Sequence, residues 1–190
     1  MEKTLAQHSS DLLKVVLFGP ESTGKTTLSG QLAQHYNTVW TPEFMRHYLQ
    51  DKWDREGKVC EQKDIIPIAK GQMQLENELA LQANRLLICD TNLLELKVYS
   101  EAYYDGFVDP NLANAALKNI YDIYFLTYID TPWKADDLRD RPEGRAEMFA
   151  AFENALIKYK LPYVLLKGDQ KTRLSKAIEV IDELLGKRIG

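Results

Sequence analysis

The residues best suited to chemistry lie near the start of the chain, between an apolar run and an amphipathic stretch. Positions 19–26 read GPESTGKT, which matches the pattern G-x-x-x-x-G-K-[S/T] of a phosphate-binding loop. Its glycines let successive backbone N–H groups point inward at phosphate oxygens, and the helix that follows adds its N-terminal dipole. The motif therefore predicts a site for a nucleoside triphosphate, and we expect ATP together with Mg²⁺.

Individual residues of this motif have different expected roles. Lys25 is placed to reach the β- and γ-phosphates, and the Thr26 hydroxyl is placed to bind Mg²⁺. The residues expected around the ATP phosphates are Gly19, Glu21, Ser22, Thr23, Gly24, Lys25, Thr26 and Thr27.

A second polar group follows an apolar run farther along the chain, where RLLICD leads into Asp90, Thr91 and Asn92. A carboxylate at the carboxyl edge of a strand beside a phosphate-binding loop can hold Mg²⁺, and Asp90 is our candidate. The alternative is a helix N-cap, because all three residue types cap helices well. We expect Asp90 to serve the metal and Thr91 or Asn92 to cap.

Glu43 and Arg46 form a third candidate group, in the stretch TPEFMR. Three residues apart, they lie on one face of a helix that starts after a short strand. The functional interpretation is a carboxylate that orients a substrate hydroxyl, with Arg46 near the transferred phosphate. The structural alternative is an ordinary salt bridge at a helix start, and position alone does not separate the two.

A charged stretch at positions 133–146 contains Arg139 and Arg145, and it is interrupted by a proline and a glycine. Such a stretch suits a lid that closes over phosphates and supplies arginines to the transferring group. Its alternative is a solvated surface, since acidic residues nearly cancel the basic ones. The aromatic residues Tyr99, Tyr103, Tyr104 and Phe107 could line a pocket for a flat ring, although core packing is the default for such a stripe.

Alternating apolar and amphipathic stretches must position these residues. The predicted strands cover 12–18, 38–40, 85–90, 121–129 and 162–166, and the predicted helices cover 24–36, 43–50, 63–84 and 171–185. Strands apolar on both faces and separated by helices predict an α/β fold with a parallel sheet covered on both faces. We therefore expect a P-loop NTPase or kinase-like fold of five strands with a small lid.

Composition limits the function classes. With 190 residues the chain predicts one domain, 1–190, and 24 Lys+Arg against 28 Asp+Glu give a net charge of −4. That balance disfavours a nucleic-acid partner, and no apolar run is long enough for a membrane span or a signal peptide. Two cysteines without a framework indicate a reducing, cytoplasmic compartment. Association into a homo-oligomer is left open.

Several motifs in order resemble one family. GPESTGKTTL, TPEFMRHYL, IAKGQMQLE, LLICDTNLLELKVYSEAYY and TPWKADDLRDRPEGRAEMF are similar to the ribosylnicotinamide kinase domain of bacterial NadR-type NAD-synthesis proteins and its stand-alone relatives. The resemblance covers about 15–168. It implies a P-loop kinase fold that uses MgATP to phosphorylate the ribose 5′-hydroxyl of nicotinamide riboside, giving nicotinamide mononucleotide.

The resemblance also implies roles for single residues. Lys25 and Thr26 would hold phosphate and Mg²⁺, and Asp90 would be the metal-side or catalytic carboxylate. Glu43 and Arg46 would face the substrate, with Gln72 on the long helix that borders the nucleoside site. Tyr103 is the aromatic residue that we add to the substrate site, and the residues expected to act from the lid are Arg139 and Arg145.

Two departures from the family qualify this interpretation. Bifunctional members carry a further segment upstream, and only a short stretch precedes the phosphate-binding loop in this sequence, so we expect neither gene repression nor completion of NAD. Many lids of this type read D-G-x-R, whereas this one reads DDLR, which predicts a stiffer lid. The alternatives are a kinase of another nucleoside or small metabolite, or a nucleotide-sensing ATPase module that acts through a partner.

Overall fold

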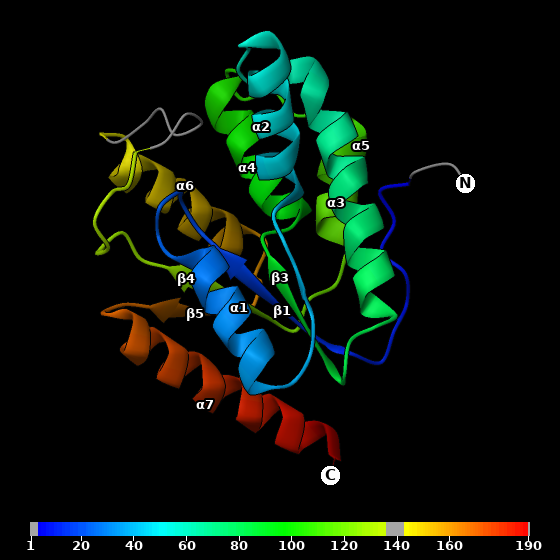
Figure 1. The fold of residues 1–190 in the computed structure, drawn as a ribbon, viewed down its shortest axis with the longest axis vertical. Helices are drawn as coiled ribbons and strands as arrows, with labels where there is room; N and C mark the ends of the chain where they lie inside the picture. Colours follow the sequence, from blue (N-terminus) through cyan, green and yellow to red (C-terminus); the bar gives the residue numbers. More distant parts are fainter. Residues whose placement is uncertain (1–3, 136–142, 190) are drawn as a thin grey trace.

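The sheet of the computed structural model has five parallel strands in the order β2-β3-β1-β4-β5 (Figure 1). The structure describes residues 4–135 and 143–189. Its strands are β1 (Leu13–Phe18), β2 (Trp40–Thr41), β3 (Leu86–Asp90), β4 (Ile123–Thr127) and β5 (Tyr163–Leu166). The parallel five-stranded sheet predicted from the sequence is confirmed.

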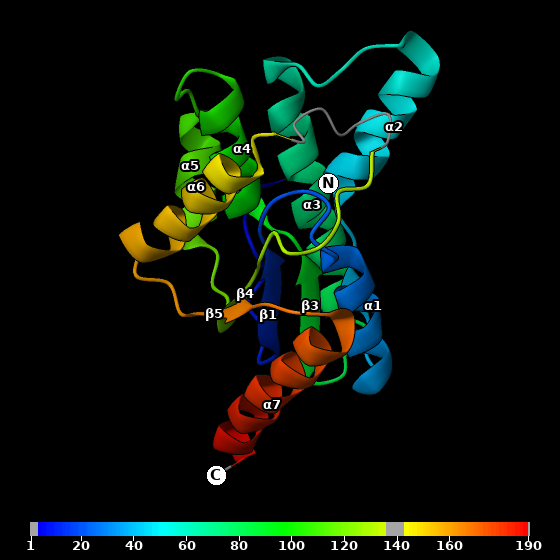
Figure 2. The same cartoon turned by 90° about the vertical axis from the view of Figure 1, so that its left-hand side faces the viewer.

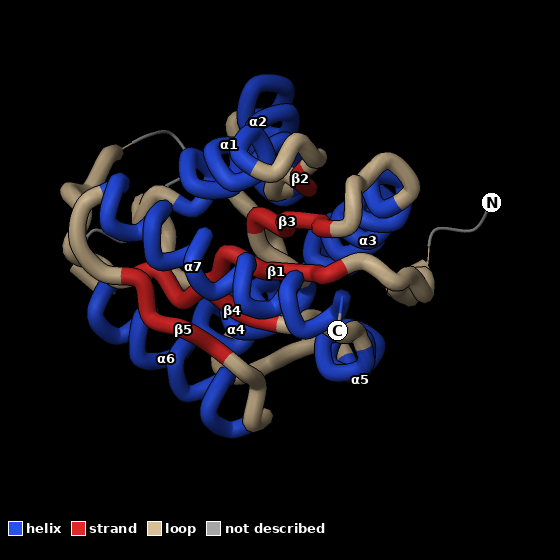
Figure 3. The backbone as a smooth tube through the Cα atoms, turned by 90° about the horizontal axis from the view of Figure 1, so that it is seen from below, coloured by secondary structure: helices blue, strands red, loops and turns tan. Residues whose placement is uncertain are grey.

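Helices cover both faces of this sheet, as Figure 3 shows from below. In the described residues these are α1 (Lys25–His35), α2 (Phe44–Glu56), α3 (Ile65–Ala80), α4 (Leu93–Tyr103), α5 (Pro110–Lys118), α6 (Arg145–Lys158) and α7 (Gln170–Ile189), with a 3₁₀ turn, η1 (Gln62–Asp64). One face packs against α1 and α7, and the other packs against α3, α4, α5 and α6. Figure 2 shows α2 and the upper parts of α3 and α4 extending past the sheet.

The alternation of side chains along β1 explains these two layers. Val16 and Phe18 belong to the cluster shared with α3–α6, whereas Val15 and Leu17 belong to the cluster shared with α1 and α7. All four side chains are fully buried. A strand buried on both faces reads as a nearly continuous apolar run, here interrupted by Lys14 alone, which is why the sequence identified it.

Some predicted boundaries are wrong. The second strand lies at 40–41 rather than 38–40, because Thr38 joins β3 through its side chain: its hydroxyl donates to the Leu86 carbonyl at 2.7 Å. The long helix spans Ile65–Ala80 rather than 63–84, since a 3₁₀ turn with a capping box precedes it and Arg85 adopts a φ of 60° after it. Helices α4, α5 and α6 lie outside the predicted ranges; α5 is capped by Asp109 and begins at Pro110.

None of the helices in the described part of the chain is long and apolar enough to cross a membrane. The carboxyl ends of β1 and β3, two neighbouring strands, lead into the phosphate-binding loop and into α4. Ligands in open α/β sheets bind at this edge. The fold therefore brings the first two predicted groups of residues together.

Candidate active site

The phosphate-binding loop needs both of its predicted glycines. Gly19 has a φ of +136°, and a Cβ on it would lie 2.8 Å from the Thr127 hydroxyl oxygen and 3.0 Å from the Thr127 carbonyl oxygen. Gly24 has a φ of +83°, at the N-cap of α1. Both positions would be strained with any side chain. The Thr23 hydroxyl completes the turn by donating to the Pro20 carbonyl at 2.8 Å.

The Lys25 ammonium is buried beneath this loop. It donates to the carbonyls of Gly19, at 2.6 Å, and Pro20, at 2.9 Å, and its Nζ lies 3.3 Å from Glu95 Oε1. Burial alone would lower the pKa of Lys25, but the carboxylates around it, Glu95 foremost, outweigh burial and raise the pKa above its ordinary value. Lys25 is thus held as a cation at the point where phosphates would arrive.

Thr26 and Asp90 meet beside Lys25. The Thr26 hydroxyl donates to Asp90 Oδ2 at 2.6 Å, while Asp90 Oδ1 is buried without a hydrogen-bond partner. Burial and the neighbouring Glu43 raise the pKa of Asp90 to about 6, against the lowering effect of Lys25 and Thr26. A hydroxyl and a carboxylate with an unused oxygen form a donor set that fits Mg²⁺. No larger cluster of His, Cys, Asp or Glu suited to a metal occurs among the described residues.

The helix cap after β3 is Asn92. Its side-chain oxygen accepts from the backbone N–H groups of Leu94, at 3.1 Å, and Glu95, at 3.3 Å. Asn92 therefore satisfies the start of α4, and Asp90 remains available to the site.

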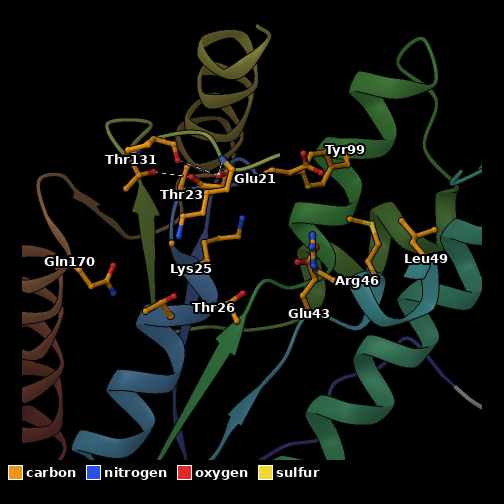
Figure 4. A pocket seen from close by; sticks show the side chains of 16 residues that line it. Glu21, Thr23, Lys25, Thr26, Glu43, Arg46, Leu49, Tyr99, Thr131 and Gln170 are labelled. Carbon is orange, nitrogen blue, oxygen red and sulfur yellow. Dashed lines mark hydrogen bonds between the residues drawn. The ribbon is translucent and has the colours of Figure 1, made fainter. Parts of the chain in front are cut away.

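A cavity of about 610 Å³ opens above the loop. It is lined by seven of the eight predicted ATP-phosphate residues, all except Gly19, and by Glu43 and Arg46. Figure 4 shows Lys25 and Thr26 facing Glu43 and Arg46 across this cavity. One wall is therefore built for phosphates, and the opposite wall carries a carboxylate and a guanidinium from the start of α2.

Gln72 fixes the start of α2 rather than lining the main cavity. Its side-chain oxygen accepts from the Phe44 N–H at 2.8 Å, and its amide nitrogen donates to the Pro42 carbonyl at 3.3 Å. Glu43 occupies the N-cap position of α2, yet its side chain makes no capping hydrogen bond. Gln72 thus takes over the capping task and leaves the Glu43 carboxylate facing the cavity.

The predicted lid divides between described and undescribed residues. Arg139 and the other residues of 136–142 lie outside the described residues. Arg145 begins α6 and donates to the carbonyls of Thr131, at 2.9 Å, and Ser22, at 3.2 Å. Its guanidinium also lies over the ring of Trp133, 5.7 Å from the centroid. In this structure the Arg145 guanidinium therefore contacts the phosphate-binding loop at the backbone carbonyl of Ser22.

Tyr103 does not line the main cavity. It lines a small neighbouring cavity of about 10 Å³ with Tyr99, Trp133 and Arg145. Tyr99 lines the main cavity as well, so it is the aromatic side chain of α4 that reaches the site.

The sequence analysis did not identify two buried charged residues that contact the phosphate-binding loop and its lysine. Glu95, on α4, pairs with Lys25 and is almost completely buried, and burial, together with the nearby Glu43 and Asp90, raises its pKa to about 8 despite Lys25. Arg173, on α7, donates to the carbonyl of Thr23 in the loop at 2.6 Å. For Glu95 the available signal was an acidic residue among the leucines of LLELKV, a run in which Lys97 is the other charged residue.

Comparison with known proteins identifies the family. The profile described as an AAA domain matches residues 14–173. The chain belongs to this AAA domain family.

Curated relatives of this AAA domain chain include the Trifunctional NAD biosynthesis/regulator protein NadR of Salmonella typhimurium (strain LT2), with 27% identity over 179 residues. The NadR protein of Escherichia coli (strain K12) is 26% identical over the same length. In both cases the match covers 92% of this chain and 43% of the relative, so the chain spans less than half the length of these relatives. The resemblance found in the motifs is confirmed.

Solved structures show the same fold. A NadR protein in complex with NAD and AMP-PNP has a TM-score of 0.78 at 22% identity, covering 93% of this chain and 50% of that one. A thymidylate kinase from Ehrlichia chaffeensis has a TM-score of 0.65 at 15% identity, covering 92% of this chain and 100% of the other. The AAA domain chain therefore has the predicted P-loop kinase-like fold.

Proposed function

We propose that this protein is an ATP-dependent kinase that phosphorylates the ribose 5′-hydroxyl of nicotinamide riboside, giving nicotinamide mononucleotide and ADP. The observation that carries the proposal is the Glu43 carboxylate, which faces the phosphate-binding loop across the main cavity instead of capping its own helix. A pure ATP-hydrolysing module needs no such acceptor wall. The similarity to NadR supports the choice of nucleoside.

In this mechanism the residues divide between the two walls. Lys25 and the loop N–H groups bind the ATP phosphates, and Thr26 and Asp90 would hold Mg²⁺, which supplies charge neutralisation when bound. Glu43 accepts the proton of the 5′-hydroxyl while that oxygen forms its bond to the γ-phosphorus and the bond to the β–γ bridging oxygen breaks. Arg46 lies beside Glu43, placed to stabilise the transferring phosphoryl group.

The remaining assignments follow from the same proposal. The acceptor is a small nucleoside rather than a nucleic acid, in keeping with the net charge of −4. We propose that residues 133–146 act as the lid, with Arg139 and Arg145 as its arginines, and that the whole chain forms one kinase domain. The expected compartment is the cytoplasm.

ADP release with and without nucleosides tests the proposal. We expect nicotinamide riboside to stimulate ADP release at least ~100-fold over the rate without nucleoside, and Glu43→Gln to lower kcat by ~100-fold while ATP affinity stays within about twofold. Formation of nicotinamide mononucleotide is checked by chromatography. A panel in which another nucleoside is preferred assigns the acceptor to that nucleoside, and a panel without stimulation contradicts kinase activity.

A further inference from the structure

The N-terminal segment, residues 4–9, lies beside α3 (Figure 1) and has no helix or strand of its own. Asn77 of α3 holds its backbone at two points. The Asn77 side-chain oxygen accepts from the His8 N–H at 2.8 Å, and its amide nitrogen donates to the Ala6 carbonyl at 3.0 Å. These two bonds flank Gln7, so they fix the position from which the Gln7 side chain reaches α3.

Gln7 completes the hydrogen bonds of a buried carboxylate on α3. Its amide nitrogen donates to Glu76 Oε1 at 2.8 Å, and its side-chain oxygen accepts from the Ile120 N–H at 2.9 Å. Glu76 is 0% exposed; its other oxygen accepts from the Tyr121 hydroxyl at 2.7 Å, and Lys14 Nζ lies 3.7 Å from Oε1. A buried carboxylate that loses a hydrogen bond is destabilised where it stands. Gln7 therefore helps to hold Glu76, and α3 with it, in place.

Glu76 shares a face of α3 with Gln72. The two residues are four positions apart, one helical turn, and both are buried. Gln72 accepts from the Phe44 N–H and so holds the start of α2, where Glu43 occupies the N-cap. A helical turn is stiff, with a rise of about 1.5 Å per residue, so a shift or rotation of α3 moves both side chains together. The position of Glu76 thus bears on the position of Glu43.

We infer that Gln7 is a positioning residue for the wall of the main cavity that carries Glu43. It fixes α3 through Glu76, and α3 fixes the start of α2 through Gln72. Gln7 lines neither the main cavity nor the small cavity of about 20 Å³ that Gln72 and Glu43 line, so it acts only through these residues. The consequence for catalysis rests on the proposed function, because Glu43 is the proposed acceptor of the hydroxyl proton.

The Phe44 amide reports this coupling without any need for activity. It lies in the first turn of α2, where a backbone N–H has no partner within its own helix, so its protection from solvent comes from Gln72. Its exchange rate is measured by NMR on the full chain. We expect Gln7→Ala to raise this rate about tenfold and to lower kcat about fivefold, while AMP-PNP affinity stays within about twofold.

A double variant separates action through Gln72 from a general effect. Gln72→Ala alone should lower kcat more than Gln7→Ala does, and Gln7→Ala/Gln72→Ala should match Gln72→Ala within about twofold, because the path from Gln7 to Glu43 is already broken. Additive losses of kcat in the double variant overturn the inference.

Two further variants serve as controls. His8→Ala removes an exposed side chain next to Gln7 and should behave like the wild type. Tyr36→Phe removes the hydroxyl that donates to Asp182, at 2.8 Å, and to the Ile178 carbonyl, at 3.2 Å, so it weakens the packing of α7 far from α3. It should lower the free energy of unfolding and leave both Phe44 exchange and kcat unchanged.

The Phe44 amide decides the inference. An exchange rate that Gln7→Ala leaves unchanged overturns it, and so does a rise that Tyr36→Phe matches at the same loss of stability in urea. If Gln7→Ala does not fold, Gln7→Asn, which keeps the amide on a shorter side chain, takes its place with a smaller shift in the same direction. A wild type without nucleoside-stimulated ADP release contradicts the proposed function alone, since Phe44 exchange still tests the positioning.

Discussion

Lys25 combines burial with positive charge, and the residues around it decide whether that combination is stable. Glu95, Glu43 and Asp90 keep its pKa above the ordinary value in spite of burial. The same pairing means that removing Lys25 has two effects. It removes a charge from the phosphate site, and it leaves the Glu95 carboxylate buried without a cation.

We predict that Lys25→Ala lowers turnover by at least ~100-fold and also lowers the free energy of unfolding. The double variant Lys25→Ala/Glu95→Gln should recover most of the stability, because no buried carboxyl is left without its partner, but none of the activity. Urea unfolding and ADP release measure the two effects separately. Equal stability of the single and double variants would contradict the pairing, and near-normal turnover of either variant would contradict the role of Lys25.

Site residues within a continuous motif can be predicted from the sequence, whereas site residues brought in by the fold cannot. Lys25 and Thr26 belong to one continuous motif whose spacing defines their geometry, so they can be predicted directly. Glu95 becomes a site residue only because β1 and β3 are neighbours, which brings the start of α4 beneath the loop. Helical spacing alone places it among apolar neighbours and gives no sign of its partner.

At the scale of elements, the position of Glu43 depends on how closely α2 approaches α3. Gly71, in the middle of α3, lies against the ring of Phe44, the first residue of α2. A Cβ at Gly71 would overlap that ring, so only glycine permits this approach. Gly30, in the middle of α1, has nothing within 4 Å of the corresponding position. A substitution at Gly30 is therefore the control for the same substitution at Gly71.

We predict that Gly71→Ala lowers kcat by about tenfold or more, because the displaced Phe44 carries Glu43 with it. Gly30→Ala should leave kcat unchanged and stabilise the protein by about 0.5–1 kcal/mol, the usual gain when alanine replaces glycine inside a helix. Steady-state kinetics and urea unfolding of both variants check this. Similar effects of the two substitutions would show that the α2–α3 approach does not position Glu43.

The strands and helices could be predicted where a short stretch of sequence carries the whole pattern of apolar and polar residues. The strands in the middle of the sheet are mostly apolar runs, broken by Lys14 in β1 and ended by Asp90 in β3, and these runs locate the strands along the chain. The edge strand β2 has two residues and pairs with β3 partly through the Thr38 hydroxyl, so no local pattern defines its limits. Helix α5 lies outside the predicted ranges although Asp109 and Pro110 form an ordinary start signal, since the helix has only nine residues.

At the scale of the whole molecule, α7, the last helix, is hydrogen-bonded to the phosphate-binding loop near the start of the chain. Arg173 of α7 is 1% exposed and donates to the carbonyls of Thr23, at 2.6 Å, Gly168, at 2.9 Å, and Tyr128, at 2.9 Å. It also pairs with Asp130. These partners lie up to 150 positions away in the sequence, and such long-range contacts leave no periodic trace. They could not be predicted without the fold.

Arg173 therefore joins α7 to the phosphate-binding loop, so we expect its replacement to affect both stability and nucleotide binding. We predict that Arg173→Lys lowers the free energy of unfolding by about 3 kcal/mol, because a single ammonium cannot replace the planar guanidinium at all of its acceptors. ATP affinity should fall as well, since the Thr23 carbonyl loses the contact that holds the loop. Arg188→Lys, on the same helix but at an exposed ion pair with Asp122, should change stability by less than about 0.5 kcal/mol. Urea unfolding and AMP-PNP titration of both variants measure these effects. If Arg173→Lys and Arg188→Lys had the same effect on the free energy of unfolding and on AMP-PNP affinity, α7 would only pack against the sheet. The buried hydrogen bond from Arg173 to the Thr23 carbonyl argues instead that Arg173 supports the phosphate-binding loop.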